Sequence, residues 1–440
     1  MVGNLPRLDK LPPLRLNILS MTQSLRNPHE VRVVITGLGA ITPIGNTVAE
    51  YWDNLIKGKS GVRRISTFST DDYSVQIAGE IDLPDAGLYF KDRKMARRLD
   101  RYVVLGQMAG TQAIKDSGLE VDKAPQRYGA LIATGDGGIG AHFINAKRIV
   151  QDGMQATSPF FVMCIPNTAS GYLAMEWNLQ GPGFSVNSAC ASANHAFAVA
   201  SVMIKAGLAD AIFTGGSEAP IYPNALAAFG NIMALSERND SPQTASRPFD
   251  KDRDGFVLSE GAGVLCLEEL EHARRRGAKI YAELTGCGLA TDAHDLVAPH
   301  PDARGSTQAI QNALDAAGLN PGQIDLINCH ATSTPLGDLS ESRAIERAFK
   351  ELAAKTPVHS TKSMTGHPMG AASAIEAIAA ILAIQQGVIH PTINQFEQDP
   401  KIGLNVVRNQ PMEAKVDHVL SNGFGFGGHN ASVIISRFRG

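Results

Sequence analysis

The most chemically suggestive residue in this sequence of 440 amino acids is Cys190. Residues 184–188 before it predict a strand, and the small residues 191–205 after it predict a helix. A cysteine at a helix N-terminus lies near unpaired backbone N–H groups, which favour its thiolate form. Cys190 is therefore a candidate nucleophile. The alternative is a buried cysteine with only a packing role.

Two histidines lie in polar loops that follow predicted strands. His330 precedes a hydroxyl-rich loop, and His367 lies five residues after Lys362 and before a predicted helix that carries Glu376. Either histidine alone could be structural. Hydrolysis of a thioester usually requires one histidine and an orienting acid. A second histidine, with no acid in these motifs, better suits an enolate whose oxygen accepts hydrogen bonds from two imidazoles.

The segment 421–430 reads Ser-Asn-Gly-Phe-Gly-Phe-Gly-Gly-His-Asn and has four glycines in six positions. This density predicts a backbone bent more sharply than other residues allow. Phe424 and Phe426 alternate with the glycines, which suggests an apolar gate. The alternative is an ordinary turn with two aromatic core residues.

Short apolar runs that alternate with helical patterns must position these residues, and they predict an α/β layered fold. In the first half the predicted strands are 33–38, 128–134, 184–188 and 211–214, and the helices are 48–57, 97–117 and 191–205. In the second half the strands are 280–289, 324–329, 418–421 and 432–436, and the helices are 307–317, 340–352 and 371–385. Residues 34–39 and 282–288 resemble each other weakly, which suggests a duplication. We divide the chain at a charged segment into halves 31–280 and 281–440, after a flexible extension, 1–30.

Composition excludes several classes of protein. The formal net charge is −3, without the basic excess of a nucleic-acid-binding protein. No uninterrupted apolar stretch is long enough for a membrane span, so we expect neither a nucleic-acid nor a membrane partner. Five cysteines without a CxxC motif indicate a reducing compartment, and we expect the cytoplasm. Residues 1–30 leave organellar import open as an alternative, and Met21 is an alternative start.

The four segments around these residues, together with residues 158–162 and 247–257, resemble the signatures of the β-ketoacyl-[acyl carrier protein] synthases. The similarity runs from about Arg32 to the C-terminus and is strongest to the elongating type II enzymes. It implies a thiolase-like, duplicated fold with α/β/α/β/α layers. It also implies a homodimer that condenses an acyl group on the cysteine with malonyl-[acyl carrier protein], releasing CO₂.

The resemblance assigns roles to the catalytic residues. Cys190 would carry the acyl group, and His330 and His367 would hold the malonyl thioester oxygen. Lys362 and Glu376 would set the charge and orientation of the two histidines.

The resemblance also assigns substrate contacts. Thr332 and Thr334 would bind the phosphopantetheine arm. The backbone N–H groups of Cys190 and Phe426 would form an oxyanion hole. Phe426 would move as the gate, with Phe424 and Gly425 beside it at the substrate.

Two further sites follow from the resemblance. Three basic residues would dock the acidic acyl carrier protein: Lys94, Arg97 and Arg98. Four residues would hold a monovalent cation, Na⁺ or K⁺, and no other cofactor is expected: Asn328, Glu376, Ser421 and Asn422.

The sequence departs from the family at several positions. Asp136 stands where an apolar or small residue is usual at the foot of the acyl pocket, which leaves the preferred chain length open. Pro368 and His429 also differ from many relatives, and we interpret His195 as structural. The alternatives are a condensing enzyme of a polyketide pathway, an inactive partner subunit and a thiolase that acts on coenzyme A thioesters. Inactive subunits typically lack the cysteine, and thiolases arrange their cysteine and histidines differently.

Overall fold

The computed structural model of the chain describes residues 30–440. All of the predicted extension 1–30 except Glu30 lies outside the described residues. The strands are β1 (Val33–Ile41), β2 (Arg63–Arg64), β3 (Ile77–Ala78), β4 (Tyr128–Ala133), β5 (Ala211–Glu218), β6 (Gly261–Glu269), β7 (Ala282–Thr291), β8 (Leu326–Asn328), β9 (Pro357–His359), β10 (Val388–Ile389), β11 (Asn405–Val406), β12 (Met412–Glu413), β13 (His418–Gly425) and β14 (His429–Ser436). The helices are α1 (Val48–Ile56), α2 (Arg101–Ser117), α3 (Ile139–Asp152), α4 (Thr168–Trp177), α5 (Ser192–Lys205), α6 (Pro223–Asn231), α7 (Leu270–Arg275), α8 (Arg304–Ala317), α9 (Pro335–Phe349), α10 (Lys362–Thr365) and α11 (Ala372–Gln386).

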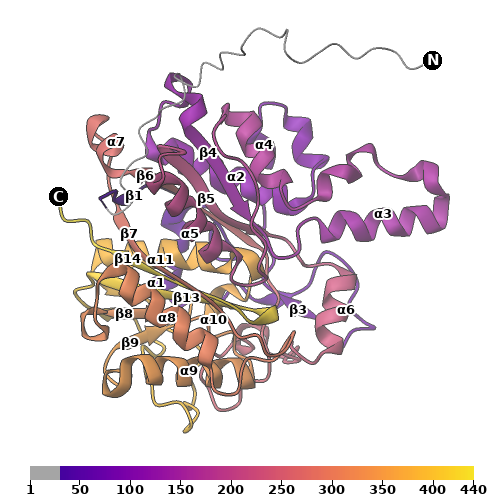
Figure 1. Cartoon of the computed structure of the whole chain (residues 1–440). Coiled ribbons are helices and arrows are strands. Elements are labelled where there is room, and N and C mark those ends of the chain that lie inside the picture. Colours follow the sequence, from indigo (N-terminus) through magenta and orange to yellow (C-terminus); the bar gives the residue numbers. More distant parts are fainter. Residues whose placement is uncertain (1–29) are drawn as a thin grey trace, which may run out of the picture.

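Ten strands form one sheet in the order β11-β9-β8-β13-β14-β7-β1-β6-β5-β4. The two halves of the chain meet where β1 pairs with β7 over a short antiparallel register. Helices α5 and α11 lie between the two halves of the sheet, α2 and α4 cover the outer face of the first half, and α8 and α9 cover that of the second (Figure 1). This confirms the predicted α/β/α/β/α layers.

A glycine contact recurs in the two halves of the chain, as a duplication predicts. In β1, a Cβ atom at Gly39 would lie 2.0 Å from the carbonyl oxygen of Ala109 in α2. In β7, a Cβ atom at Gly288 would lie 2.1 Å from the carbonyl oxygen of Ala309 in α8. Each strand therefore approaches its covering helix so closely that only glycine fits, and it does so in the same way in both halves.

Helix α11 is the apolar centre of the second half. All of its residues from Ala372 to Ile384 are buried. Within the described residues, the stretch Met369–Gln386 is the one helix long and apolar enough to cross a membrane, but 89% of it is buried inside the protein. This burial is what a core helix shows.

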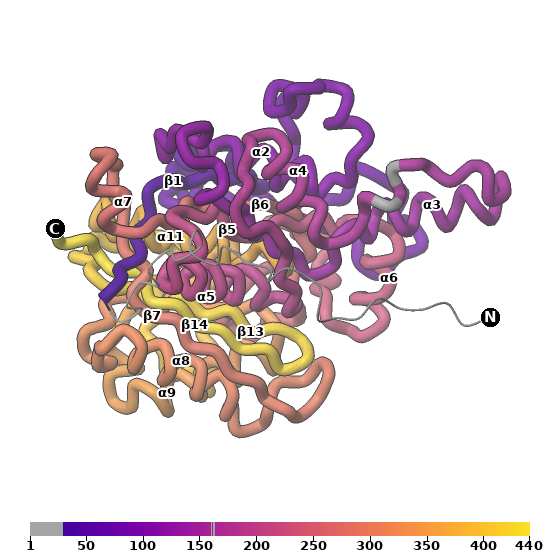
Figure 2. The backbone as a smooth tube through the Cα atoms, turned by 45° about the horizontal axis from the view of Figure 1, so that its top comes forward, coloured from indigo at the N-terminus to yellow at the C-terminus, as the bar shows by residue number. Residues whose placement is uncertain are grey.

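Most predicted elements are confirmed, but several differ in their bounds, and three of these differences bear on the site. Helix α2 begins at Arg101 and not at residue 97, because the Asp100 side chain caps it, and Arg93–Arg97 forms a separate 3₁₀ turn. Helix α9 begins five residues earlier than predicted, at Pro335. Strands β13 and β14 extend up to a tight turn at Phe426–Gly428, so the glycine-rich segment is a hairpin, which Figure 2 shows beside β7.

Candidate active site

Cys190 lies in a turn immediately before α5, as predicted, but residues 184–188 do not form a strand. Side chains replace the backbone ladder beside β4: Ser170 Oγ donates to the carbonyl of Phe184 (2.8 Å), and Asn187 Nδ2 donates to the carbonyl of Thr134 (2.7 Å). The nucleophile segment is therefore an extended chain that side chains tether to the sheet.

The turn that carries Cys190 is tightly constrained. Ala189 has a φ of 50°, in the left-handed region that most residues avoid. On the facing hairpin, a Cβ atom at Gly425 would lie 2.7 Å from the Ser188 carbonyl oxygen and 3.0 Å from the Cys190 nitrogen. The close approach of these two backbones requires glycine, and it brings the N–H group of Phe426 to the sulfur of Cys190.

The structure brings both predicted histidines to this cysteine from the other half of the chain. His330 follows β8, and His367 follows α10. Nε2 of His367 lies 3.0 Å from Sγ of Cys190, and the two imidazole rings are 5.4 Å apart and nearly perpendicular. One donor atom of each of the three residues lies within 4.8 Å of the others.

Burial controls the charges at the site. It raises the pKa of the Cys190 thiol to about 12, although the Lys362 charge and the Phe426 N–H oppose the shift. Burial therefore opposes the thiolate that the helix N-terminus favours, and the expected thiolate stays a prediction. Burial, followed by the Lys362 charge, lowers the pKa of both His330 and His367 well below the ordinary value. Burial therefore favours the neutral thiol and the neutral imidazoles.

Lys362 and Glu376 form an ion pair beneath the histidines. Both side chains are 1% exposed, and Lys362 Nζ donates to Glu376 Oε1, which also accepts from Thr361 Oγ1 (3.2 Å). A buried ammonium is tolerated here because a carboxylate neutralises it.

Sequence reasoning missed Glu341, which positions His330. Its two carboxylate oxygens accept the backbone N–H groups of His330 (2.8 Å) and Ala331 (2.7 Å). Asn422 Nδ2 also donates to it (2.9 Å). Burial raises the pKa of Glu341 to about 7. Glu341 lies inside a polar, amphipathic helix where acids are common, so no signal in the single sequence marks it.

The three side chains open into a cavity of about 350 Å³. All but one of the residues predicted at the substrate line this cavity. Those that line it are Thr332, Thr334, Phe424, Gly425 and Phe426. The exposed side chains of Met233 and Leu336 also line it, so the cavity reaches the surface there.

Asp136 is the predicted substrate residue that does not line this cavity. It lies in the loop after β4, where its backbone N–H donates to Glu218 Oε1 (3.2 Å). Burial, and then the Asp136 charge, raises the pKa of Glu218 to about 7. A place for Asp136 at the foot of the acyl pocket stays a prediction.

A second missed residue, Asp292, holds the Phe426 turn. Its backbone N–H donates to the carbonyl of Gly428 (2.9 Å), and its Oδ1 accepts from Asn430 Nδ2 (3.0 Å). The Gly427 N–H also donates to the carbonyl of Leu296 in the same loop (2.7 Å). The proposed gate is therefore hydrogen-bonded to the loop after β7.

The threonine loop is held by a buried arginine from the 247–257 motif. Arg253 Nε donates to the carbonyl of Thr334 (3.1 Å), and Nη2 donates to that of Pro335 (2.8 Å). Asp338 Oδ1 accepts from the N–H of Ser333 (3.0 Å), whose φ is 74°. The motif is visible in the sequence, but its role requires the tertiary contact.

The predicted docking residues Lys94, Arg97 and Arg98 are exposed, on and next to the 3₁₀ turn. Arg97 and Arg98 border a separate cavity of about 410 Å³, which they share with Arg148 of α3. This turn precedes α2, so Arg97 and Arg98 lie before the helix and not at its start, where the predicted range 97–117 had placed them.

The residues predicted to hold a cation are all buried. Asn328 Oδ1 and Glu376 Oε2 have no hydrogen-bond partner in the structure, whereas Asn328 Nδ2 donates to Ser421 Oγ (3.0 Å). The Asn422 side chain donates a hydrogen bond to Glu341 and accepts one from Ser432 Oγ. Two unpartnered buried oxygens fit a hard monovalent cation.

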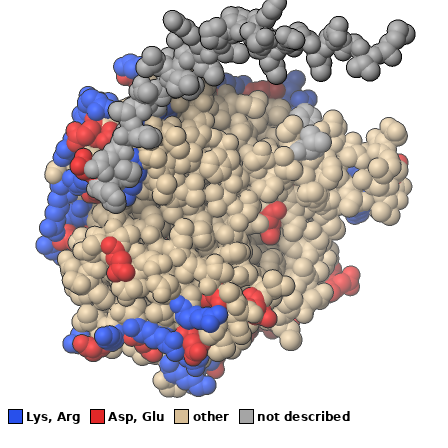
Figure 3. Space-filling model, in the orientation of Figure 1, with Lys and Arg blue, Asp and Glu red and all other residues tan. Residues whose placement is uncertain are grey.

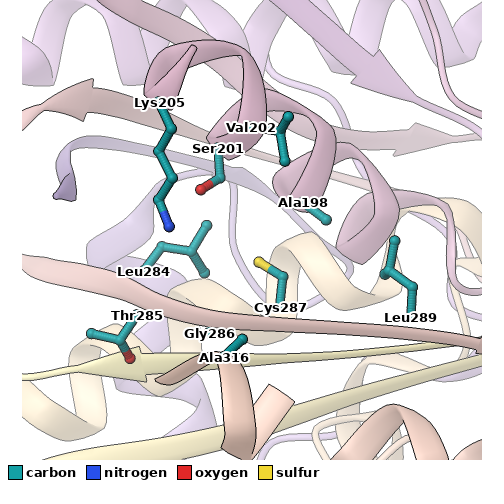
Figure 4. Close-up of a pocket in the computed structure, with 10 residues that line it drawn as sticks. All are labelled: Ala198, Ser201, Val202, Lys205, Leu284, Thr285, Gly286, Cys287, Leu289 and Ala316. Carbon is teal, nitrogen blue, oxygen red and sulfur yellow. The ribbon is translucent and has the colours of Figure 1, made fainter. Parts of the chain in front are cut away.

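A third cavity, of about 200 Å³, lies between α5 and β7 and does not have the groups for catalysis (Figure 4). Lys205 and Cys287 both face it in this view. Burial raises the pKa of Cys287 to about 12, and no imidazole lines the cavity. It is a space between two packed elements.

The chain is similar to known proteins over most of its length. The family model for the beta-ketoacyl synthase N-terminal domain matches residues 30–273, and the model for the C-terminal domain matches residues 281–396. The chain is 44% identical over 417 residues to the 3-oxoacyl-[acyl-carrier-protein] synthase 2 of Synechocystis sp., which covers 94% of this chain and 100% of that protein. A protein of the same name from Coxiella burnetii is 44% identical over 409 residues, with coverage of 92% and 98%.

Solved structures also match. A beta-ketoacyl synthase from Burkholderia phymatum superposes with a TM-score of 0.86 at 32% identity, covering 93% of this chain and all of that one. The ishigamide ketosynthase/chain length factor superposes with a TM-score of 0.87 at 35% identity, covering 94% and 100%. A type II polyketide ketosynthase in complex with its acyl-carrier protein superposes with a TM-score of 0.86 at 31% identity, covering 93% and 100%.

Proposed function

Because the chain belongs to the β-ketoacyl synthase family, we propose that it condenses an acyl group on Cys190 with malonyl-[acyl carrier protein] in fatty-acid elongation. The products are β-ketoacyl-[acyl carrier protein] and CO₂, and the carrier that delivered the acyl group is released. The observation that carries the proposal is the convergence of Cys190, His330 and His367 within 4.8 Å inside a cavity that reaches the surface.

In the first half-reaction, Sγ of Cys190 attacks the acyl thioester while Nε2 of His367, 3.0 Å away, accepts the thiol proton. The N–H groups of Cys190 and Phe426 stabilise the oxyanion, and the carrier thiol leaves with a proton. A neutral His367 is needed for this step, and burial keeps it neutral.

In the second half-reaction, the malonyl thioester oxygen accepts hydrogen bonds from His330 and His367, and the carboxylate leaves as CO₂. The enolate carbon attacks the acyl carbon on Cys190, so a C–C bond forms and the C–S bond breaks. Each neutral imidazole donates through its one N–H group, and each such donor contributes about 3 kcal/mol in comparable sites.

A direct test uses the purified chain with an acyl-carrier protein and labelled malonyl-carrier protein. We expect an acyl adduct on Cys190 by mass spectrometry and one CO₂ released per β-ketoacyl product. Cys190→Ala should give no adduct, whereas Cys164→Ser, which removes a buried thiol outside this cavity, should behave as wild type. An adduct that persists in Cys190→Ala would refute the assignment.

Condensation in a polyketide pathway is the second candidate, because one matching solved structure is a type II PKS ketosynthase. That chain is 31% identical to this one, whereas the relatives named 3-oxoacyl-[acyl-carrier-protein] synthase 2 are 42–44% identical, so fatty-acid elongation is better supported. The acyl groups recovered on Cys190 from the native host distinguish the two, since saturated chains support elongation and poly-β-keto chains support the polyketide pathway.

We also propose that the enzyme is a homodimer that works in the cytoplasm, where its five free cysteines would stay reduced. The centre of the face in Figure 3 has few charged side chains. Beside the edge strand β4, the segment 184–187 leaves Phe184 exposed (38%), and α5 exposes Val202 (65%). Phe184→Lys with Val202→Glu should convert a dimer into monomers in sedimentation experiments, and an unchanged mass would exclude this face.

We further propose that Asn328 and Glu376 hold Na⁺ or K⁺, with Ser421 and Asn422 beside them. The ion would neutralise the buried carboxylate oxygen that Lys362 leaves free and would stiffen the loops around the histidines. Replacing both ions with tetramethylammonium should lower the midpoint of thermal unfolding in wild type but not in Asn328→Leu. An identical decrease in both proteins would place the ion elsewhere.

A further inference from the structure

The three reactive side chains have the composition of a metal site. Among residues 30–440, Cys190, His330 and His367 are the one group of three or more Cys, His, Asp or Glu side chains whose donor atoms lie this close together. The thiol comes from the turn before α5, and the imidazoles come from the loops after β8 and α10.

The donors match zinc in type and spacing. Thiolate sulfur and imidazole nitrogen are both zinc ligands, and a zinc site with three protein ligands keeps its fourth position open. Zinc bonds of about 2.0 to 2.3 Å place tetrahedral donors roughly 3.5 Å apart. Here the Cys190–His367 separation is 3.0 Å and all donor pairs lie within 4.8 Å, so an ion would fit after small side-chain movements.

The surrounding charges permit a cation. Lys362 is close enough to act on all three side chains, but Glu376 pairs with it, so the net charge of that pair is zero. The Glu341 carboxylate accepts the backbone N–H group of His330 and lines the same cavity. The cavity reaches the surface, so an ion can enter the site through it.

From this arrangement we infer that Cys190, His330 and His367 bind zinc and other thiophilic divalent ions in the free enzyme, and that the bound ion inhibits it. Coordination takes Cys190 as the thiolate, so one proton leaves to the buffer for each ion bound. The ion then occupies the sulfur and nitrogen lone pairs that acylation needs. An acylated or alkylated Cys190 has no free thiolate and is protected from the metal.

The test is a spectroscopic titration of the full chain with Co²⁺ as the probe, followed by competition with Zn²⁺. We expect a sulfur-to-cobalt charge-transfer band at one equivalent, which Zn²⁺ abolishes. The band should be absent after Cys190→Ser or after alkylation of Cys190. His330→Ala and His367→Ala should each weaken Co²⁺ binding at least tenfold, with circular dichroism used to verify folding.

The chain supplies a matched control. Cys164 Sγ lies 3.1 Å from His142 Nε2, a second thiol–imidazole pair without a third donor. Cys164→Ser should leave the band unchanged. A missing band in wild type, or a band lost in Cys164→Ser but kept in Cys190→Ser, would overturn the inference. Condensing activity measured in metal-free buffer is independent of this result, so failure of the proposed function and failure of the metal site are distinguishable.

Discussion

At the scale of single residues, the two histidines differ in their contact with the nucleophile. His367 is hydrogen-bonded to Cys190, whereas the ring of His330 faces His367 and Phe424. His367 can therefore serve both half-reactions, but His330 serves only the second.

We accordingly expect His330→Ala to lower CO₂ release by about 10²–10³-fold, the usual loss for one oxyanion donor. Acyl-enzyme formation should fall by less than about tenfold. His367→Ala should slow both steps. The two steps are measured separately with labelled malonyl-carrier protein and by mass spectrometry of the acyl-enzyme, and equal losses in His330→Ala would contradict this division.

A second residue-scale feature is a buried pair of stacked histidines behind the Lys362 loop. The rings of His359 and His390 are 3.8 Å apart and both are fully buried. The His390 ring opposes a positive charge on His359, whereas the His390 ring is hydrogen-bonded to the Pro391 carbonyl. Burial lowers the pKa of His390 to about 4 and that of His359 well below its ordinary value.

Because the folded-state pKa lies below the unfolded value of about 6.5, the unfolded chain binds protons first as the pH falls. The stability from neutral His390 is complete above pH 6.5, and about 3 kcal/mol of it should be lost as the pH falls from 6.5 towards 4. Urea unfolding at several pH values measures this, and His390→Phe should flatten the profile. A slope that is unchanged in His390→Phe would assign the effect to other groups.

At the scale of elements, the site depends on how closely the β13–β14 hairpin approaches the nucleophile turn. Gly425→Ala would place a methyl group 2.7 Å from the Ser188 carbonyl oxygen and 3.0 Å from the Cys190 nitrogen. We expect the two backbones to separate, and acyl-enzyme formation to fall by about 10²-fold as the Phe426 N–H moves away.

Gly171→Ala in α4 is the control, because a Cβ atom there would meet nothing within 4 Å. It should keep full activity and stabilise the protein by about 0.5–1 kcal/mol. Stopped-flow acylation and thermal unfolding distinguish the two variants. Normal acylation in Gly425→Ala would show that the hairpin is free to adjust.

The elements also show how far the sequence alone could predict the structure. Periodicity and glycine placement predicted most helices and strands, and the resemblance predicted which loops converge. The prediction of a strand at residues 184–188 was wrong because side-chain hydrogen bonds replace the backbone ladder there. Ser170 from α4 binds this segment, and Asn187 within it binds the loop after β4. Glu341 and Asp292 were missed because their roles depend on partners brought near by tertiary folding. Glu341 accepts the N–H group of His330, and the N–H group of Asp292 donates to the carbonyl of Gly428.

At the scale of the whole molecule, docking of the carrier protein should depend on long-range charge. Arg97 and Arg98 lie outside α2, so reversing their charge should not unfold that helix. Arg97→Glu with Arg98→Glu should raise KM for an acyl-carrier substrate at least tenfold and flatten its dependence on ionic strength, since charges at the rim of an interface act on the encounter rate.

Turnover of a short acyl-pantetheine mimic should stay nearly unchanged in this variant. Arg274→Glu with Arg275→Glu, the same change of charge on exposed α7, should leave KM for the carrier substrate as in wild type. Equal loss of activity on the carrier substrate and the mimic would make the cluster structural.

The order of strands in the sheet has a consequence for how the protein is made. Strand β14 is the last strand in the sequence, yet it lies in the middle of the sheet, between β13 and β7. While a ribosome is still adding these residues, β7 and β13 have exposed, unpaired edges of the kind that promote aggregation. The newly made chain therefore cannot close its sheet, or bring His330 and His367 to Cys190, until almost all of it has been translated. A chaperone that shields β7 and β13 during this interval would raise the yield of active enzyme.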